Sequence, residues 1–305
     1  MERNNWRKRI KSFVTKVYSK SQPNMIFSVI GDSDNLIPKP WPKSRFQQSL
    51  TYAAKAAGNC LILSKGEPLK VSKIVREMME EYIYLEKPAR PNLRLISVPS
   101  KPVEDTGLYF DLPEVLEFDE NQSNNNESRG KGKDKDEEAE IYADDSFFCK
   151  LPARTADEDY IDFRAELERT LERPTDEERN ALLLILVEGD LSAVDHIKLA
   201  TESGIPVVFM KGTGGLADLM SIAMEDSEVE IRTLLPVLFG IELDDTEHEI
   251  ETLEECLKTI LERSYLIDTF DLVEKNEEQF AALVGELVQK SRLLENKDSS
   301  KKHAL

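Results

Sequence analysis

Short uninterrupted apolar runs alternate along this chain with longer segments of helical patterning. The runs are rich in Val, Ile, Leu and Phe, a composition that favours buried strands. They lie at residues 24–30, 59–63, 93–98, 181–187 and 205–210. Because strands that alternate with helices pair in parallel through right-handed crossovers, the sequence predicts an α/β fold built on a doubly wound parallel sheet.

The segments between these runs have the apolar spacing of helices that bury one face. Predicted helices cover residues 43–57, 69–82, 160–172 and 191–203, another begins after Gly214, and residues 146–149 form a weaker candidate strand. No strand pattern follows Glu225. Three amphipathic segments at 229–240, 250–264 and 277–294 predict a separate C-terminal helical layer.

Composition divides the chain into a basic N-terminal arm (1–23), an α/β domain (24–225), a helical region (226–295) and a frayed tail (296–305). The arm predicts a solvated helix, with contact to an acidic partner or lipid as the alternative. Residues 119–145 are dominated by Asn, Ser, Gly, Lys and acidic residues, which predicts a disordered acidic insertion in the α/β domain.

The formal net charge of −19 disfavours binding to nucleic acid or to an anionic membrane, because their phosphates would be repelled. Cys60, Cys149 and Cys256 are too scattered for a disulfide framework or a CxxC metal clip, which indicates a reducing compartment. No apolar run approaches the roughly 20 residues of a membrane span. The sequence therefore predicts a cytoplasmic protein.

A strand, a glycine-rich turn and a helix follow one another directly in Pro206-Val-Val-Phe-Met-Lys-Gly-Thr-Gly-Gly-Leu-Ala-Asp218. Glycines allow backbone N–H groups to approach an anion, and a helix N-terminus adds a favourable dipole. Gly212, Thr213 and Gly214 are therefore candidate phosphate-binding residues. The alternative is a plain turn that needs glycine for its geometry alone.

Other predicted strands end at Gly31, Ser64 and Gly189, which would share one edge of a parallel sheet with this turn. Acidic residues that would repel a phosphate stand beside two of them, at Asp32, Glu188 and Asp190. Arg164 is the candidate clamp, because a guanidinium can grip a phosphate with two hydrogen bonds. Its alternative role is a surface salt bridge with a neighbouring Glu.

The sequence offers little for catalysis. His196, His248 and His303 lack a second His or Cys at metal-ligand spacing, so no metal site is predicted. Neither a GxSxG elbow nor a GxxxxGK[ST] loop occurs. We therefore expect a protein that is not an enzyme.

Several segments resemble the cytosolic N-terminal region of melastatin-type TRP channels, over roughly residues 24 to 224. Ile161-Asp-Phe-Arg164 with Glu166-Leu-Glu168 resembles "E-I-x-F-R-x-x-L-E", and Leu184-Ile-Leu-Val-Glu-Gly189 resembles "V-x-L-V-L-E-G-G". Residues 206–218 resemble "P-V-V-V-x-x-G-S-G-R-A-A-D". Residues 25–31 and 53–58 are similar to the family's opening strand and its "A-A-x-x-T-G-A-W" helix end.

The resemblance implies a Rossmann-like fold of the SLOG superfamily, some members of which bind ADP-ribose. It places Gly212, Thr213 and Gly214 at the phosphate and makes Arg164 the family's helix arginine. The sequence departs from the pattern at several positions: Gly215 replaces the arginine of G-S-G-R, Ser64-Lys65-Gly66 replaces T-G-G, and the paired glycines are Gly31-Asp32 and Gly189-Asp190. The P-G-G-x-G-T-x-x-E signature of the phosphoribohydrolase branch is absent.

The resemblance thus implies a ligand-sensing domain at the cytosolic face of a membrane, which binds a nucleotide such as ADP-ribose and regulates a cation channel, for instance a calcium channel. A second hypothesis is a degenerate assembly module that contacts channel subunits or forms a homo-oligomer. A nucleotide hydrolase is the third. No cofactor is assigned beyond the ADP-ribose-like ligand.

Overall fold

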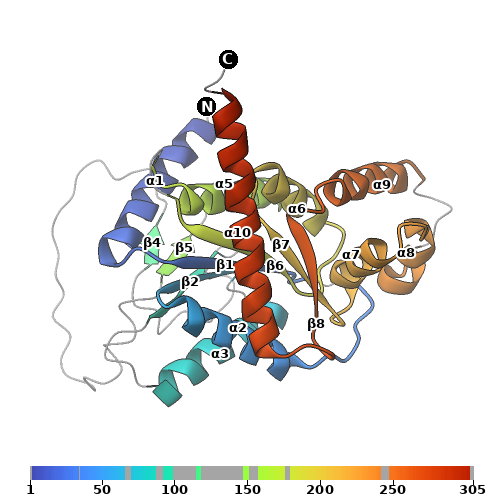
Figure 1. The fold of residues 1–305 in the computed structure, drawn as a ribbon, viewed down its shortest axis with the longest axis horizontal. Coiled ribbons are helices and arrows are strands. Elements are labelled where there is room, and N and C mark those ends of the chain that lie inside the picture. The colour runs from blue at the N-terminus through green and yellow to red at the C-terminus, as the bar shows by residue number, and fades with distance from the viewer. Residues whose placement is uncertain are drawn as a thin grey trace.

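The computed structural model describes residues 2–33, 35–65, 70–86, 92–98, 115–117, 147–150, 157–175, 179–241 and 247–302. These residues contain an eight-stranded sheet with the strand order β4-β5-β3-β2-β1-β6-β7-β8 (Figure 1). Every neighbouring pair in the sheet is parallel, which confirms the predicted fold class.

The strands span β1 Met25–Ile30, β2 Cys60–Ser64, β3 Leu93–Ser97, β4 Val115–Glu117, β5 Phe147–Lys150, β6 Ala181–Leu186, β7 Val207–Lys211 and β8 Ile267–Asp271. The helices span α1 Glu2–Lys20, α2 Lys43–Ala57, α3 Lys70–Glu86, α5 Asp157–Glu172, α6 Ala193–Glu202, α7 Gly215–Glu225, α8 Ile231–Phe239, α9 Glu247–Leu261 and α10 Glu277–Lys302.

Helices cover both faces of the sheet, so its central strands are apolar on both sides. All six residues of β6 are buried. Ile26 of β1 belongs to a core shared with α1, α5, α6, α7 and α9, whereas its neighbour Phe27 belongs to a second core shared with α2, α3 and α10. The alternation of side chains along each strand therefore builds two cores, one on each face.

The prediction of a purely helical region after Glu225 was wrong. The strand β8 pairs with β7 through Val207–Lys211 and forms one edge of the sheet. Its sequence, Ile267-Asp-Thr-Phe-Asp271, is short and half polar, because Ile267 and Phe270 are the buried positions. The last helix, α10, also continues to Lys302 beyond the predicted end at residue 294, so residues 296–302 are helical rather than a frayed tail.

The basic N-terminal arm is a helix, as predicted, but it is not fully solvated. Ile10, Phe13, Val14 and Val17 recur at helical spacing and are buried in the core that also contains residues of α5. The apolar stripe anchors α1 to the domain, while Lys8, Lys11 and Lys16 are exposed and Arg7 pairs with Glu166 of α5. The predicted insertion at 119–145 lies outside the described residues.

Cys60 is a buried thiol whose Sγ donates to the carbonyl of Ala54. Burial raises the pKa of Cys60 to about 12, although the nearby Arg94 charge acts in the opposite direction. The reactive thiolate is therefore scarce at neutral pH. When the folded protein is alkylated, peptide mass spectrometry should find Cys60 unmodified while the half-buried Cys256 reacts. Equal labelling rates for the two would contradict this burial, and denaturant should make Cys60 reactive.

Candidate functional site

The topology places a switch point at the carboxyl ends of β1 and β6, and we call this edge of the sheet the crevice. The chain passes from β1 outward to β2 and β3, and its later strands β6, β7 and β8 lie on the other side of β1. Open α/β sheets bind ligands where the strand order reverses in this way. The predicted shared edge is present: Gly31 lies against Val187, and Gly189 lies against the Lys211–Gly215 bend.

None of the described helices is both long and apolar enough to cross a membrane.

Backbone carbonyls occupy the N-terminus of α7, where a phosphate was predicted to bind. The Leu216 N–H donates to the Gly189 carbonyl at 2.8 Å, and the Ala217 N–H donates to the Glu188 carbonyl at 2.9 Å. These two amides are among the donors that an anion at a helix N-terminus would use. In this chain the loop after β6 already satisfies them.

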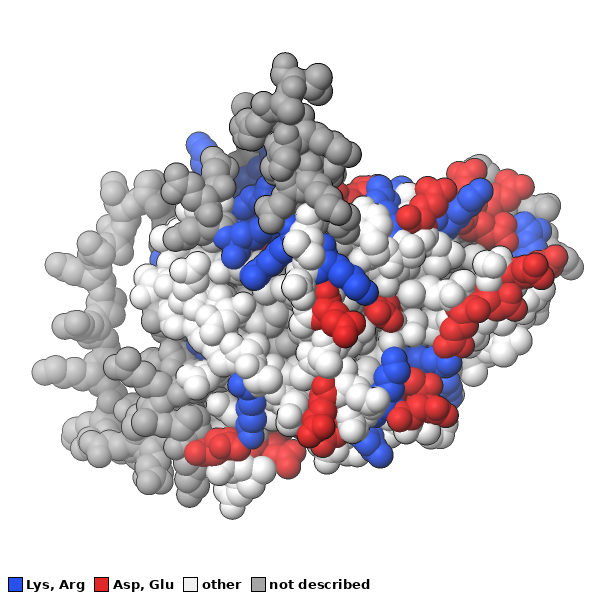
Figure 2. Space-filling model, in the orientation of Figure 1, with Lys and Arg blue, Asp and Glu red and all other residues white. Residues whose placement is uncertain are grey.

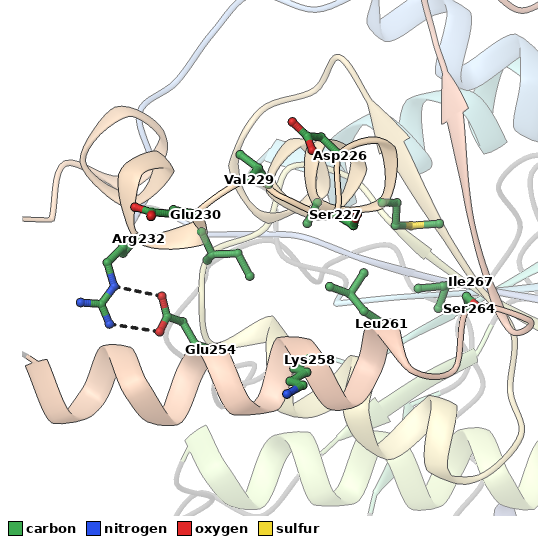
Figure 3. A pocket seen from close by; sticks show the side chains of 13 residues that line it. Asp226, Ser227, Val229, Glu230, Arg232, Glu254, Lys258, Leu261, Ser264 and Ile267 are labelled. Carbon is green, nitrogen blue, oxygen red and sulfur yellow. Dashed lines mark hydrogen bonds and ion pairs between the residues drawn. The ribbon is translucent and has the colours of Figure 1, made fainter.

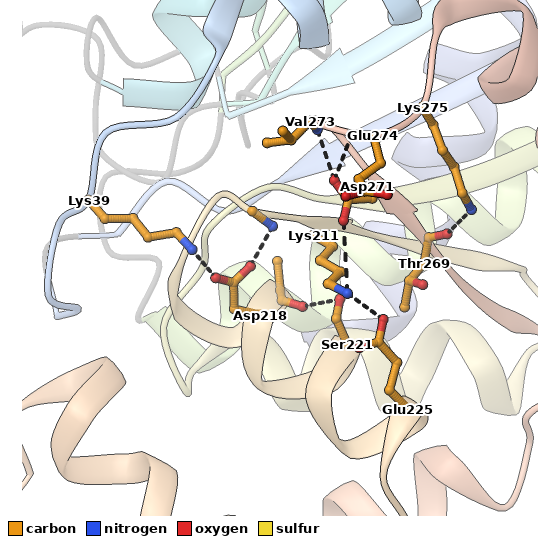
Figure 4. A network of polar contacts seen from close by, with 12 residues as sticks. Lys39, Lys211, Asp218, Ser221, Glu225, Thr269, Asp271, Val273, Glu274 and Lys275 are labelled. Atoms are coloured by element: carbon orange, nitrogen blue, oxygen red, sulfur yellow. Dashed lines mark hydrogen bonds and ion pairs between the residues drawn. The ribbon is translucent and has the colours of Figure 1, made fainter.

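The bend itself is also hydrogen-bonded internally. The Thr213 hydroxyl donates to the Met210 carbonyl at 2.8 Å and accepts from the Glu188 N–H at 2.8 Å. The Gly212 N–H donates to Asp218 Oδ1 at 2.7 Å (Figure 4). Two of the three residues predicted to contact phosphate are therefore engaged with the protein's own groups.

A segment that we call the strap, residues 31–33 and 35–42, crosses the same edge. The Lys39 ammonium pairs with Asp218, and the aliphatic part of Lys39 lies over Gly214, 3.4 Å from where a Cβ would stand (Figure 4). Further along the strap, the Trp41 indole N–H donates to the Glu188 carboxylate. The strap thus covers the third predicted phosphate residue, Gly214.

Two of the three acidic residues beside the crevice lie at helix N-termini, the exception being Glu188. Asp190 accepts from the Ser192 N–H at the start of α6 and from the Ser33 hydroxyl of the strap. Asp32 accepts from the Ser72 N–H in the first turn of α3 at 2.9 Å. A carboxylate in this position satisfies free amides and interacts favourably with the helix dipole. Asp32 and Asp190, which were expected to repel a phosphate, thus accept from the same kind of N–H groups that a phosphate would need.

The glycines at the crevice are required by backbone packing. Gly31 has φ +133°, and a Cβ there would stand 1.7 Å from the Val187 carbonyl oxygen. A Cβ on Gly215, which has φ +53°, would stand 2.3 Å from the Gly189 carbonyl oxygen. Side chains are excluded at both positions whether or not a ligand binds. The alternative interpretation, in which the turn needs glycine for its geometry alone, accounts for these contacts.

The contacts that the structure describes for Arg164 lie in the core rather than at the crevice. It is 1 % exposed, its Nε donates to Glu168 Oε1 at 2.9 Å, and its terminal nitrogen donates to Ser28 Oγ at 2.9 Å. His196 Nε2 lies 2.8 Å from Glu168 Oε2. These four residues, Ser28, Arg164, Glu168 and His196, form a buried polar cluster between β1, α5 and α6. The predicted salt bridge with a Glu exists, but it is buried rather than on the surface.

Glu168 carries the charge at the centre of this cluster. Burial acts to raise its pKa, but His196, Arg164 and the Ser28 hydroxyl outweigh burial and lower the pKa to about 2. Sequence reasoning did not identify Glu168 or His196 as members of a site. The Arg164–Glu168 spacing of four residues was the available signal, since such residues are neighbours on a helix.

Ser64 and Lys211 are two further residues at this edge of the sheet. Ser64 is buried at the end of β2, and its hydroxyl has no hydrogen-bond partner among the described residues. Lys211 Nζ lies 2.5 Å from Glu225 and 3.8 Å from Asp271, and the hydrogen bond with Glu225 raises its pKa (Figure 4). The lysine of the bend therefore points to α7 and β8. No group of His, Cys, Asp and Glu side chains suited to a metal ion occurs in the part of the chain that the structure describes.

Comparison with protein families gives one assignment. A family model described as SLOG in TRPM matches residues 2–238, from the first described residue into the last turn of α8. No curated protein matches significantly. The match covers well over half of the chain and includes β1, β6, β7 and the bend that follows. The chain therefore belongs to the SLOG-in-TRPM family.

Proposed function

We propose that this chain is a cytoplasmic N-terminal module of a melastatin-type TRP channel or of a pore-less relative, and that it works through protein contacts rather than through nucleotide binding or catalysis. Family membership supports the kind of module. The observation that favours contact over ligand sensing is the pair of hydrogen bonds from the Leu216 and Ala217 amides to the Gly189 and Glu188 carbonyls. The two carbonyls occupy the position in which an anion would bind at the N-terminus of α7.

A phosphate at the bend would face a large cost. It would have to displace both carbonyls and leave them without partners, which costs about 1–3 kcal/mol for each buried polar group. It would also lie close to the carboxylates of Glu188 and Asp218, and the partly exposed Lys39 is the cation paired with Asp218 there. Arg164, the predicted clamp, is committed to Glu168.

One observation supports the second candidate, a nucleotide-sensing domain. The Lys39 side chain is 42 % exposed, and it is tied to the bend by its ion pair with Asp218. If a ligand such as ADP-ribose lifted the strap, Lys39 would supply a cation beside Gly214. The hydrolase alternative gains no support from any contact among the described residues.

Thermal melting with added nucleotide separates the two candidates. A ligand at 100 times its dissociation constant adds about 2.7 kcal/mol to the stability, which corresponds to a rise in Tm of about 5–10 °C for a domain of this size. We expect ADP-ribose, ADP and inorganic phosphate, each at millimolar concentration, to leave the Tm unchanged.

The variants Lys39→Ala and Lys73→Ala provide the matched comparison. Lys73 makes a long surface ion pair with Glu77 on α3, away from the bend. A nucleotide-dependent rise in Tm that Lys39→Ala removes and Lys73→Ala preserves would overturn the contact-only proposal. It would identify the strap as a ligand-responsive element.

A further inference from the structure

A groove of about 930 Å³ lies between the connection at residues 226–230, the start of α8, and α9 (Figure 3). It is lined by the end of α7 and the start of β8, at the amino edge of the sheet. The crevice described above lies at the carboxyl edge. The groove is therefore a second, separate feature, and its role does not depend on whether the crevice binds a nucleotide.

Most of the surface that lines the groove is apolar. Val229, Ile231, Leu261 and Ile267 contribute to it, and Leu261 projects from α9 toward the 226–230 connection (Figure 3). The groove is at the upper end of the roughly 300–1,000 Å³ range in which protein pockets hold drug-sized apolar groups. This volume suits a few large apolar side chains of a partner.

The adjoining helix α8 is apolar, and although Ile231, Leu234, Leu238 and Phe239 pack in part against the core, some of its apolar surface stays exposed. Its sequence is Ile231-Arg-Thr-Leu-Leu-Pro-Val-Leu-Phe239, yet Leu235 is the residue it buries fully. Val237 is 67 % exposed, and Leu234, Leu238 and Phe239 are half-buried. An apolar helix beside an apolar groove is typical of an interaction surface.

The charged residues that line the groove carry a small excess of acid. Arg232 and Glu254 bridge one end with two contacts of 3.2 and 3.1 Å and neutralise each other (Figure 3). The lining carboxylates of Asp226 and Glu230 then outnumber the lining cation, Lys258. Further exposed carboxylates occur on the same elements, at Glu228 in the connection, at Glu251 and Glu255 on α9, and at Glu262 just after it. Acidic side chains also gather over the part of the molecule that holds α8 and α9 in Figure 2.

We propose that this groove binds a basic amphipathic helix of a partner protein. Apolar residues at positions i, i+3, i+4 and i+7 of such a helix would enter the groove, as in other helix-in-groove complexes. Its Lys and Arg residues would face Asp226, Glu230 and the flanking carboxylates. The chain's net charge of −19 would also speed the encounter with a basic partner. This inference rests on the contact role proposed above, for which it names the class of partner.

A synthetic peptide of about 18 residues provides the probe, with Leu at helical a/d-type spacing and Lys elsewhere. Binding of the fluorescein-labelled peptide to the full chain is followed by anisotropy at physiological salt. Two comparison peptides carry Glu in place of Lys, or the same Leu and Lys residues in an order without helical spacing. We expect the amphipathic Leu/Lys peptide to bind at least about tenfold more tightly than either.

Three variants locate the binding site. Glu230→Lys should weaken binding about fivefold through charge, and Leu261→Ala about tenfold through the loss of an apolar contact. Glu80→Lys, at an exposed position on α3, changes the net charge by the same amount away from the groove and should have no effect. Melting curves check that each variant is folded, and Glu230 is exposed, so its substitution leaves the core intact.

The outcomes are separable from those of the nucleotide experiment. Equal binding of the unpatterned peptide, or equal weakening by Glu80→Lys, would mean that only the overall charge attracts the peptide and would overturn the groove proposal. Failure of the peptide to bind would overturn it as well. Neither result would bear on the crevice, which is tested by ADP-ribose.

Discussion

Replacing Glu168 with glutamine is expected to lower the free energy of unfolding by about 3–5 kcal/mol, because it leaves the buried Arg164 guanidinium without its counter-ion. Both side chains are almost completely buried, at 1 % and 0 % exposure, so water does not replace the lost interaction. His196 and Ser28 also lose the charged acceptor that they now share. Urea unfolding followed by circular dichroism measures the difference.

Two further variants make this prediction specific. Glu166→Gln, on the same helix, removes partly exposed ion pairs with Arg7 and Arg169 and should cost less than about 1 kcal/mol. The double variant Arg164→Leu/Glu168→Leu removes both charges and should be more stable than Glu168→Gln alone. If Glu168→Gln costs no more than Glu166→Gln, the cluster does not hold a buried charge.

The same cluster predicts a pH dependence. Because the folded pKa of Glu168 is depressed to about 2, its contribution to stability is complete above the unfolded value near 4.5. The contribution is lost as the pH falls from about 4.5 to about 2. The difference in unfolding free energy between the wild type and Glu168→Gln should therefore narrow across this range. A difference that stays constant would mean that the carboxylate is not preferentially charged in the fold.

Much of the fold could be predicted because its signals are local. The helix predicted at 43–57 coincides with α2, and β1, β2, β3, β6 and β7 each lie within a residue or two of the expected apolar runs. The strand β8 was missed for a physical reason. It is an edge strand that buries Ile267 and Phe270 but leaves three polar positions partly exposed, so it has neither a continuous apolar run nor a strict alternation.

The chemistry of the crevice could not be predicted in the same way. The glycine-rich bend and its helix were visible in the sequence, but the groups that accept from the Leu216 and Ala217 amides come from Glu188 and Gly189, on a different strand end. Likewise, the sequence indicated that Arg164 needs an anionic partner, but not that Ser28 and His196 would complete its surroundings. Which donors remain available to a ligand depends on such long-range contacts.

Gly215→Arg restores the arginine of the family's G-S-G-R pattern, yet we expect it to destabilise the protein by about 2–5 kcal/mol and to create no phosphate site. Gly215 has φ +53°, and its Cβ would stand 2.3 Å from the Gly189 carbonyl oxygen and 3.2 Å from that of Glu188. These carbonyls accept the first amides of α7, so relieving the clash would also weaken the start of the helix. Thermal unfolding with and without ADP-ribose measures both effects.

Substitutions at two other glycines distinguish the two causes of this loss of stability, backbone strain and steric clash. Gly212 also has a positive φ, +96°, but its nearest neighbour, Val273 Cγ2, is 4.0 Å from the Cβ position, so Gly212→Ala should show backbone strain of about 1–3 kcal/mol without a clash. Gly285 lies in α10 with nothing within 4 Å, and Gly285→Ala should stabilise the helix by up to about 1 kcal/mol. A Gly215→Arg protein that melts like the wild type and gains a nucleotide-dependent Tm shift would show that the carbonyls of Glu188 and Gly189 yield to a ligand. In that case the crevice of this chain would be a binding site that a single substitution can restore.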